Sequence, residues 1–140
     1  MPQSLSGHHV GVTVSDLETT VAFYRDVLGL PVLDRFEVSG EAFETVTGLE
    51  GAGGRFVHLD AGDVRLELVE YEPAGETLED SDLNQPGAAH VGLAVDDLAS
   101  VYAGLSDDVE TLSAPQTTAS GTTLCFLRDP EGNLVELLEA

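Results

Sequence analysis

Alternation of apolar residues with small or polar ones appears twice along the chain in nearly the same form. The segment HVGVTVSDL at 9–17 returns as HVGLAVDDL at 90–98, with six of the nine positions identical. A period of two is typical of a strand that is buried on one face. In each copy the branched apolar residues share one face, and the histidine and glycine lie on the other. The recurrence predicts two related modules.

A helix is expected after each of these strands. The first has a roughly helical apolar stripe and should run to about Leu28, where Gly29 can end it. The second is shorter and should end near Gly104. Candidate capping residues precede both helices: Ser15 or Asp16, and Asp96 or Asp97.

Both halves also end alike, in two apolar strands joined by a turn rich in glycine and aspartate, which is typical of a hairpin. The expected strand segments are 56–60 with 64–70, and 124–128 with 134–139. Each half therefore has the pattern βαβββ, and the fold class is α+β.

The length of 140 residues suits a single domain, 1–140. We expect module one at about 5–71, a linker at about 72–88 and module two at about 89–140. The glycine-rich stretch 39–54 is interpreted as a loop with one possible short strand, which could cover a site.

Charge changes this picture most. There are 26 acidic residues against 5 basic ones, all arginine, for a formal charge of −21. Since acids are spread along the whole chain, we favour a halophilic protein whose repulsion is screened by salt over a surface for a cationic partner. The charge excludes a basic footprint for nucleic acid. A single cysteine, no targeting segment and no long apolar run predict a cytoplasmic protein that does not enter membranes.

Four residues occupy matching places in the two halves. His9 and His90 begin the first strand of each half, and Glu67 and Glu136 lie in the last strand. Taken singly, each is best explained as an ordinary strand residue facing solvent. Their repetition instead indicates two histidines and two glutamates placed around one point.

A divalent cation would remove the repulsion between two carboxylates in one concave site, and two neutral imidazoles complete a neutral ligand set. Mixed nitrogen and oxygen ligands suit Zn, Mn, Fe, Co or Ni. Four protein ligands leave up to two octahedral positions for substrate oxygens or water.

Several segments carry a resemblance to a known family. HVGVTVSDLETTVAFYRDVLGL at 9–30, RLELVEY at 65–71 with HVGLAV at 90–95, and DPEGNLVELLE at 129–139 resemble the vicinal oxygen chelate superfamily of glyoxalase I, bleomycin-resistance and extradiol dioxygenase proteins. The resemblance implies paired βαβββ modules that form a cupped mixed sheet around one metal ion.

The metal ligands implied by this resemblance are His9, Glu67, His90 and Glu136. Glyoxalase I and methylmalonyl-CoA epimerase are the most similar members, which implies an isomerase or lyase that acts through a metal-stabilised enolate on a small thioester or hemithioacetal. Glu67 or Glu136 would be the catalytic base, with Glu136 favoured by resemblance.

Two other functions stay open. An extradiol dioxygenase would use iron with His9, His90 and Glu136, and Glu67 would then occupy a position that iron chemistry leaves for substrate or oxygen. A non-catalytic protein would bind a small drug in the cup, as in resistance. The site could form within one chain or between exchanged halves of two, and a homodimer is the default expectation.

Further residues near these strands could take part. His8 should face away from His9, because neighbouring strand residues point to opposite sides. His58 could be a pocket acid or base, although a structural role is favoured. Arg65 shares the face of Glu67 and could meet an anionic substrate, although pairing with an acid is favoured. Cys125 should be a buried small apolar residue.

Overall fold

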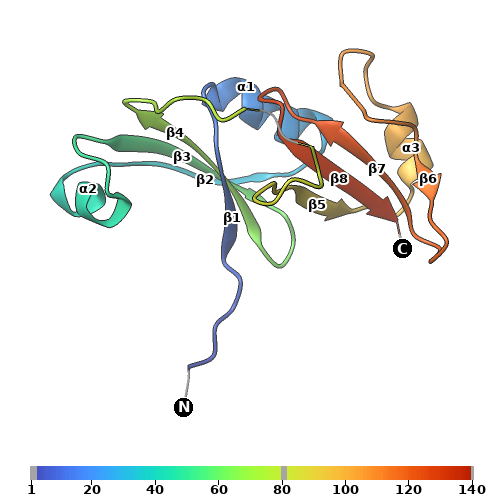
Figure 1. Ribbon diagram of the computed structural model, residues 1–140, viewed down its shortest axis with the longest axis horizontal. Helices are drawn as coiled ribbons and strands as arrows, with labels where there is room; N and C mark the ends of the chain where they lie inside the picture. The colour runs from blue at the N-terminus through green and yellow to red at the C-terminus, as the bar shows by residue number, and fades with distance from the viewer. Residues whose placement is uncertain (1–2, 80–81, 140) are drawn as a thin grey trace. The chain divides into compact units, whose positions relative to one another are not determined.

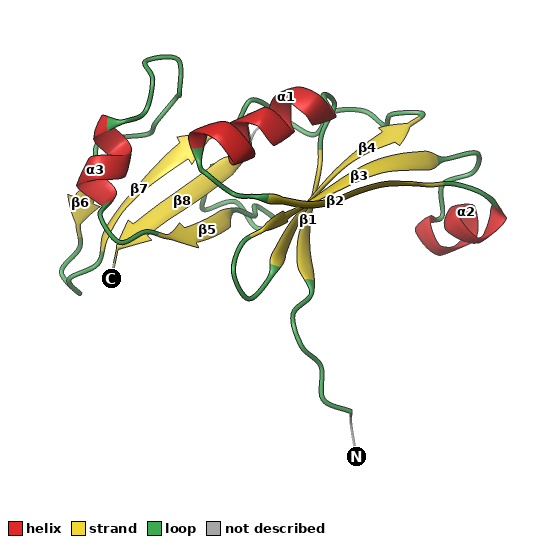
Figure 2. Ribbon diagram, turned by 180° about the vertical axis from the view of Figure 1, so that it is seen from behind, coloured by secondary structure: helices red, strands yellow, loops and turns green. Residues whose placement is uncertain are grey.

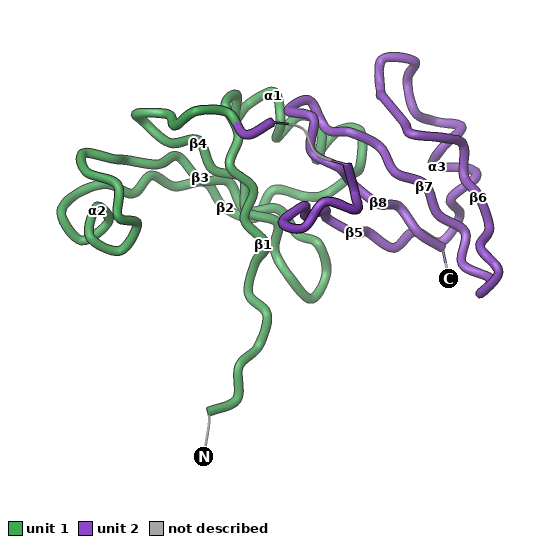
Figure 3. The backbone as a smooth tube through the Cα atoms, in the orientation of Figure 1, with its two compact units in different colours: residues 1–77 green, residues 78–140 purple. Residues whose placement is uncertain are grey.

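The computed structural model describes residues 3–79 and 82–139. The chain divides into two compact units, Met1–Thr77 and Leu78–Ala140, which Figure 3 colours separately. We call them unit 1 and unit 2 and describe each by itself.

Unit 1 is built around a four-stranded mixed sheet with the strand order β1-β4-β3-β2 (Figure 1). Strand β1 runs parallel to β4, and the other two pairings are antiparallel. Its elements are β1 (His9–Thr13), α1 (Leu17–Ala22), the π-helical turn η1 (Phe23–Val27), β2 (Val32–Val38), α2 (Glu41–Thr47), β3 (Gly53–Asp60) and β4 (Arg65–Glu72).

Unit 2 repeats this plan. Its sheet has the order β5-β8-β7-β6, again with one parallel pair, β5 with β8, and antiparallel pairs elsewhere (Figure 2). Its elements are β5 (Val91–Ala94), α3 (Leu98–Ala103), β6 (Gln116–Thr117), β7 (Thr123–Arg128) and β8 (Leu134–Glu139). The α+β class and the two βαβββ modules expected from the sequence are confirmed.

In both units one sheet face forms the apolar core. Leu66 and Leu68 of β4 are 1% and 0% exposed, and Val135 and Leu137 of β8 are 0% and 1% exposed. Since side chains alternate along a strand, the glutamate between each pair points to the opposite face. Burial of these apolar side chains stabilises the fold by about 25 cal/mol per Å² of apolar surface. Because a shift of one residue would expose them, this burial determines which face of the strand carries the glutamate.

Two carboxylates hold the start of α1 in unit 1, and two hold the start of α3 in unit 2 in the same way. The N-cap Asp16 accepts from the backbone N–H of Thr19, and Asp97 accepts from that of Ser100. A glutamate at the end of the last strand also reaches the first helical N–H: Glu70 accepts from Leu17 at 2.8 Å, and Glu139 accepts from Leu98 at 2.8 Å. These bonds satisfy N–H groups that a helix leaves unpaired at its start.

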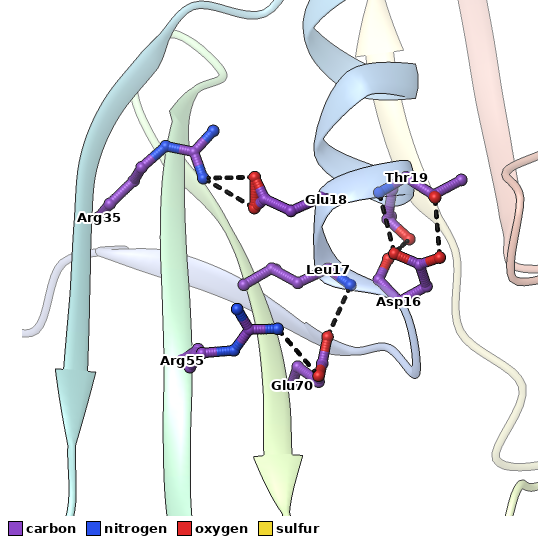
Figure 4. A network of polar contacts seen from close by, with 8 residues as sticks. Asp16, Leu17, Glu18, Thr19, Arg35, Arg55 and Glu70 are labelled. Atoms are coloured by element: carbon purple, nitrogen blue, oxygen red, sulfur yellow. Dashed lines mark hydrogen bonds and ion pairs between the residues drawn. The ribbon is translucent and has the colours of Figure 1, made fainter.

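Figure 4 shows the start of helix α1 together with Arg35 and Arg55, which contact nearby glutamates. The guanidinium of Arg55 contacts Glu70 at 3.0 Å, and that of Arg35 contacts Glu18 at 2.9 Å. The bond from the Leu17 N–H, followed by the bond from Arg55, lowers the pKa of Glu70 below its usual value. Glu70 therefore stabilises unit 1 in its charged form.

The stretch 39–54 corrects the sequence prediction. It was expected to be a loop with one possible short strand, but it contains helix α2 and the first residues of β3. Its glycines mislead because they bound the helix: Gly48 at the C-cap has φ +71°, a left-handed conformation that glycine adopts without strain.

Two further expectations concern single features. Cys125 is 3% exposed, and burial raises the pKa of its thiol, as expected for a small apolar residue. Within residues 3–79 and 82–139, no helix has both the length and the apolar character needed to cross a membrane.

Candidate metal-binding site

The first candidate pair lies on the sheet of unit 1. Nε2 of His9 is 3.5 Å from Oε2 of Glu67, and the glutamate side chain is 15% exposed. Gly11 is the neighbour of Glu67 in the parallel register of β1 and β4. A Cβ at Gly11 would sit 3.6 Å from Oε1 of Glu67, so the glycine leaves open space beside the carboxylate.

The second pair lies at the same place in unit 2. Nε2 of His90 is 3.1 Å from Oε1 of Glu136, and the glutamate side chain is 20% exposed. Gly92 is the neighbour of Glu136 in the parallel register of β5 and β8, and a Cβ there would sit 3.9 Å from Oε1. The four predicted ligands are therefore brought together two by two, one imidazole and one carboxylate in each unit.

The chemistry of each pair fits half of a four-ligand centre. An imidazole nitrogen and a carboxylate oxygen are ligands that Zn, Mn, Fe, Co and Ni accept. The glycine next to each carboxylate leaves room for a further atom. Over residues 3–79 and 82–139, no group of three or more histidine, cysteine, aspartate or glutamate side chains has an arrangement suited to a metal ion. The set of four thus stays a prediction.

Unit 1 contains a further contact that sequence reasoning did not assign. Nε2 of His58 lies 2.7 Å from Oε2 of Glu67, and these two residues are direct cross-strand partners in β3 and β4. The side chain of His58 is 7% exposed. Nη1 of Arg65 lies 3.3 Å from Nδ1 of the same ring. Arg65 thus contacts a histidine, where pairing with an acid was favoured.

The equivalent place in unit 2 holds a phenylalanine. Phe126 of β7 is the cross-strand partner of Glu136 in β8. Its ring meets the ring of His90 edge to face, with centroids 5.3 Å apart. The alignment of the two modules therefore places Phe126 opposite one glutamate and His58 opposite the other.

His8 departs from the sequence prediction. It was expected to face away from His9, but its Nδ1 lies 2.8 Å from Nδ1 of His9. The reason is that strand β1 begins at His9, so the alternation of a strand does not extend to the residue before it. Since His9 bonds through Nδ1, its Nε2 stays directed toward Glu67.

Comparison with known proteins places this chain in a family. Residues 7–137 match the Glyoxalase/Bleomycin resistance protein/Dioxygenase superfamily. The chain is 31% identical to the mitochondrial methylmalonyl-CoA epimerase of Mus musculus, and the match covers 95% of this chain and 72% of that protein.

Solved structures agree with this result. A glyoxalase family protein from Bacillus cereus has a TM-score of 0.86 at 24% identity, covering 99% of this chain and 95% of that one, which supports the fold alone. The trypanothione-dependent glyoxalase I of Leishmania major has a TM-score of 0.67 at 25% identity, covering 97% of this chain and 87% of that one. The chain belongs to the glyoxalase/bleomycin resistance protein/dioxygenase superfamily, as its sequence motifs predicted.

Proposed function

We propose that this protein is a divalent-metal-dependent isomerase or lyase that removes a proton next to a carbonyl group of a small thioester or hemithioacetal. The observation that carries the proposal is that each sheet has a glutamate beside a glycine in the parallel register, with a histidine two residues before that glycine and next to the glutamate. The relatives named methylmalonyl-CoA epimerase and glyoxalase I support this class of reaction.

In this proposal His9, Glu67, His90 and Glu136 hold one divalent cation, of Zn, Ni, Co, Mn or Fe. When bound, the cation would polarise the substrate carbonyl and stabilise the negative charge that develops on its oxygen. Each histidine presents Nε2 next to its glutamate, at 3.5 Å in unit 1 and 3.1 Å in unit 2. The open space at Gly11 and Gly92 leaves the carboxylates accessible from the strand beside them.

A glutamate would take the substrate proton. Both Glu67 and Glu136 are partly exposed, at 15% and 20%, so either carboxylate could reach a bound molecule. We favour Glu136 as the base, because Glu67 has a second histidine within hydrogen-bond distance. A base needs freedom to approach the substrate carbon and return.

The first experiment is the metal content of protein purified in high salt without chelator, for the native chain, Glu67→Gln and Glu136→Gln. Nearly one equivalent of Ni, Co, Mn or Zn in the native protein, reduced in both variants, is the expected result. The chain offers matched controls on the same strands: Glu70→Gln and Glu139→Gln remove carboxylates that bind helix N–H groups, and both should keep the metal.

Other outcomes separate the alternatives. Iron that is retained after the loss of Glu67 would favour an extradiol dioxygenase. A protein without metal that still binds small molecules would favour the resistance-type binding function. Turnover is then followed as exchange of the α-proton of methylmalonyl-CoA with deuterium, and as isomerisation of hemithioacetals. Sedimentation of the same samples tests the expected homodimer.

A further inference from the structure

The two candidate glutamates differ in what lies across the strand. Glu67 faces His58, with Nε2 to Oε2 at 2.7 Å, and Glu136 faces Phe126, whose ring carries no donor. His58 and Phe126 are both aromatic rings on the strand before the glutamate. They differ in polarity, because only the histidine ring can donate a hydrogen bond.

The contacts of His58 determine where its proton lies. A guanidinium can only donate, so Nη1 of Arg65 donates to Nδ1 of His58 at 3.3 Å. With Nδ1 accepting, Nε2 is the ring nitrogen left to donate. A proton on Nε2 is donated to Oε2 of Glu67. Arg65, His58 and Glu67 thus form a chain of hydrogen bonds that all run in one direction.

His58 is also held firmly in place. Its side chain is 7% exposed, and the ring of Phe36 on β2 meets it edge to face with centroids 5.2 Å apart. A buried donor with neighbours on both sides has few alternative rotamers. The carboxylate that accepts from it is therefore restricted to one orientation, with Oε2 also 3.5 Å from Nε2 of His9.

We propose that His58 is a positioning residue that fixes the carboxylate of Glu67 next to His9, whereas Glu136 accepts from its own candidate partner His90 at 3.1 Å and has an apolar ring, not a donor, across the strand. This inference rests on the proposed function in one respect, the role of Glu67 as a metal ligand. It assigns unequal roles to the two glutamates: Glu67 is the fixed ligand, and Glu136 is the carboxylate that moves. Donors behind metal ligands commonly change metal affinity 10- to 100-fold.

The first test reads the proton directly in the metal-free protein. Nitrogen-15 NMR of the histidine rings should show a proton on Nε2 of His58, with Nδ1 accepting from Arg65, and the Nε2 proton should remain after Zn²⁺ is added. A proton on Nδ1 would overturn the proposal. Loss of the Nε2 proton on adding Zn²⁺ would also overturn it, because His58 would then be a ligand itself.

The second test measures Mn²⁺ affinity by competition with a chelator. His58→Phe copies unit 2 and should weaken binding at least tenfold. His58→Gln keeps a donor on a side chain of similar reach and should restore most of the affinity. The reverse substitution in unit 2, Phe126→His, should leave the Mn²⁺ affinity unchanged or raise it. Equal affinity in the native protein and His58→Phe, or equal losses in His58→Phe and His58→Gln, would contradict positioning by a hydrogen bond.

The two tests also separate this inference from the proposed function. If the native protein bound neither Mn²⁺ nor Zn²⁺, the metal-dependent function would be wrong. The NMR measurement on the metal-free protein would still decide whether His58 donates to Glu67, by comparison with Glu67→Gln. Circular dichroism and thermal unfolding of each variant confirm that the comparison is made between folded proteins.

Discussion

Units 1 and 2 carry the same candidate metal ligands, one histidine and one glutamate each, in different surroundings. Unit 1 has His9 at the start of its first strand, and unit 2 has His90 directly before β5. Each unit has a glutamate beside a glycine on its last strand. In unit 1 a buried histidine lies across from the glutamate, and in unit 2 a phenylalanine lies there. The repeat therefore keeps the histidine and the glutamate, and it changes the residue across from the glutamate from a hydrogen-bonding ring to an apolar one.

The contacts between the last strand and the helix are more alike in the two units than the surroundings of the candidate ligands. Glu70 and Glu139 both accept from the first N–H of the helix that follows the first strand, at 2.8 Å in each unit. Both glutamates lie three residues after a candidate ligand, so they point to the opposite face of the strand. The same strand thus anchors a helix on one face and presents a candidate ligand on the other.

The largest expected effect separates the two ligands from the two anchors. Glu67→Gln and Glu136→Gln should each lower turnover at least ~100-fold, because loss of a general base or of a charged ligand removes stabilisation of the transition state. Glu67→Gln should also lose more metal than Glu136→Gln, since the fixed carboxylate contributes more to affinity. Full activity in both variants, in an α-proton exchange assay with metal analysis of the same samples, would refute the mechanism.

A second prediction concerns the two cores. Leu68→Ala and Leu137→Ala remove fully buried side chains and should each cost about 2–5 kcal/mol of unfolding free energy, measured by denaturant titration. Val46, which is 81% exposed, provides the control: Val46→Ala should change stability by less than about 0.5 kcal/mol.

Cys125 shows whether the two cores open separately. This buried thiol of β7 should react slowly with a thiol reagent in the native protein, because burial raises its pKa. Leu137→Ala should accelerate labelling more than Leu68→Ala, since only the former loosens the sheet that contains the thiol. Equal acceleration by both variants would mean that the two units open together.

A fourth prediction uses acid to test the helix anchor Glu70. The pKa of Glu70 is lowered from its usual value of 4.5, so its contribution is present above that pH and is lost as the pH falls through the lower, folded value. Glu70→Gln should therefore cost about 1 kcal/mol at neutral pH, and the difference from the native protein should vanish in acid. A pH-independent difference in unfolding free energy would show that the charge of Glu70 has no part in it.

The smallest expected effect concerns the space beside each carboxylate. A Cβ at Gly11 would lie 3.6 Å from Glu67, and one at Gly92 would lie 3.9 Å from Glu136, both ordinary contacts. Gly11→Ala and Gly92→Ala should fold normally and weaken Mn²⁺ binding by about twofold, or ~0.4 kcal/mol, with Gly11→Ala the weaker binder. The reverse order would indicate that Glu136, and not Glu67, is the carboxylate with less freedom.

Much of this architecture is local in origin and could be predicted. The alternation at 9–17 and 90–98 is a property of neighbouring residues, so it predicts the two strands and their apolar faces, although β5 begins one residue after His90. The glycines of 39–54 show where a prediction from neighbouring residues alone is wrong. The same residues that suggest a loop also end helices, and the segment between Gly40 and Gly48 is helical.

What the sequence determined by itself is the repeat, the βαβββ order, and the face of the strand to which each candidate glutamate belongs. What the tertiary structure decided is which side chains meet. The pairing of His58 with Glu67, and of Phe126 with Glu136, depends on the antiparallel register of separate strands. Register is set by burial of both strands' apolar faces and by the turn between them, so the residue opposite a ligand can be read only when the sheet is assembled.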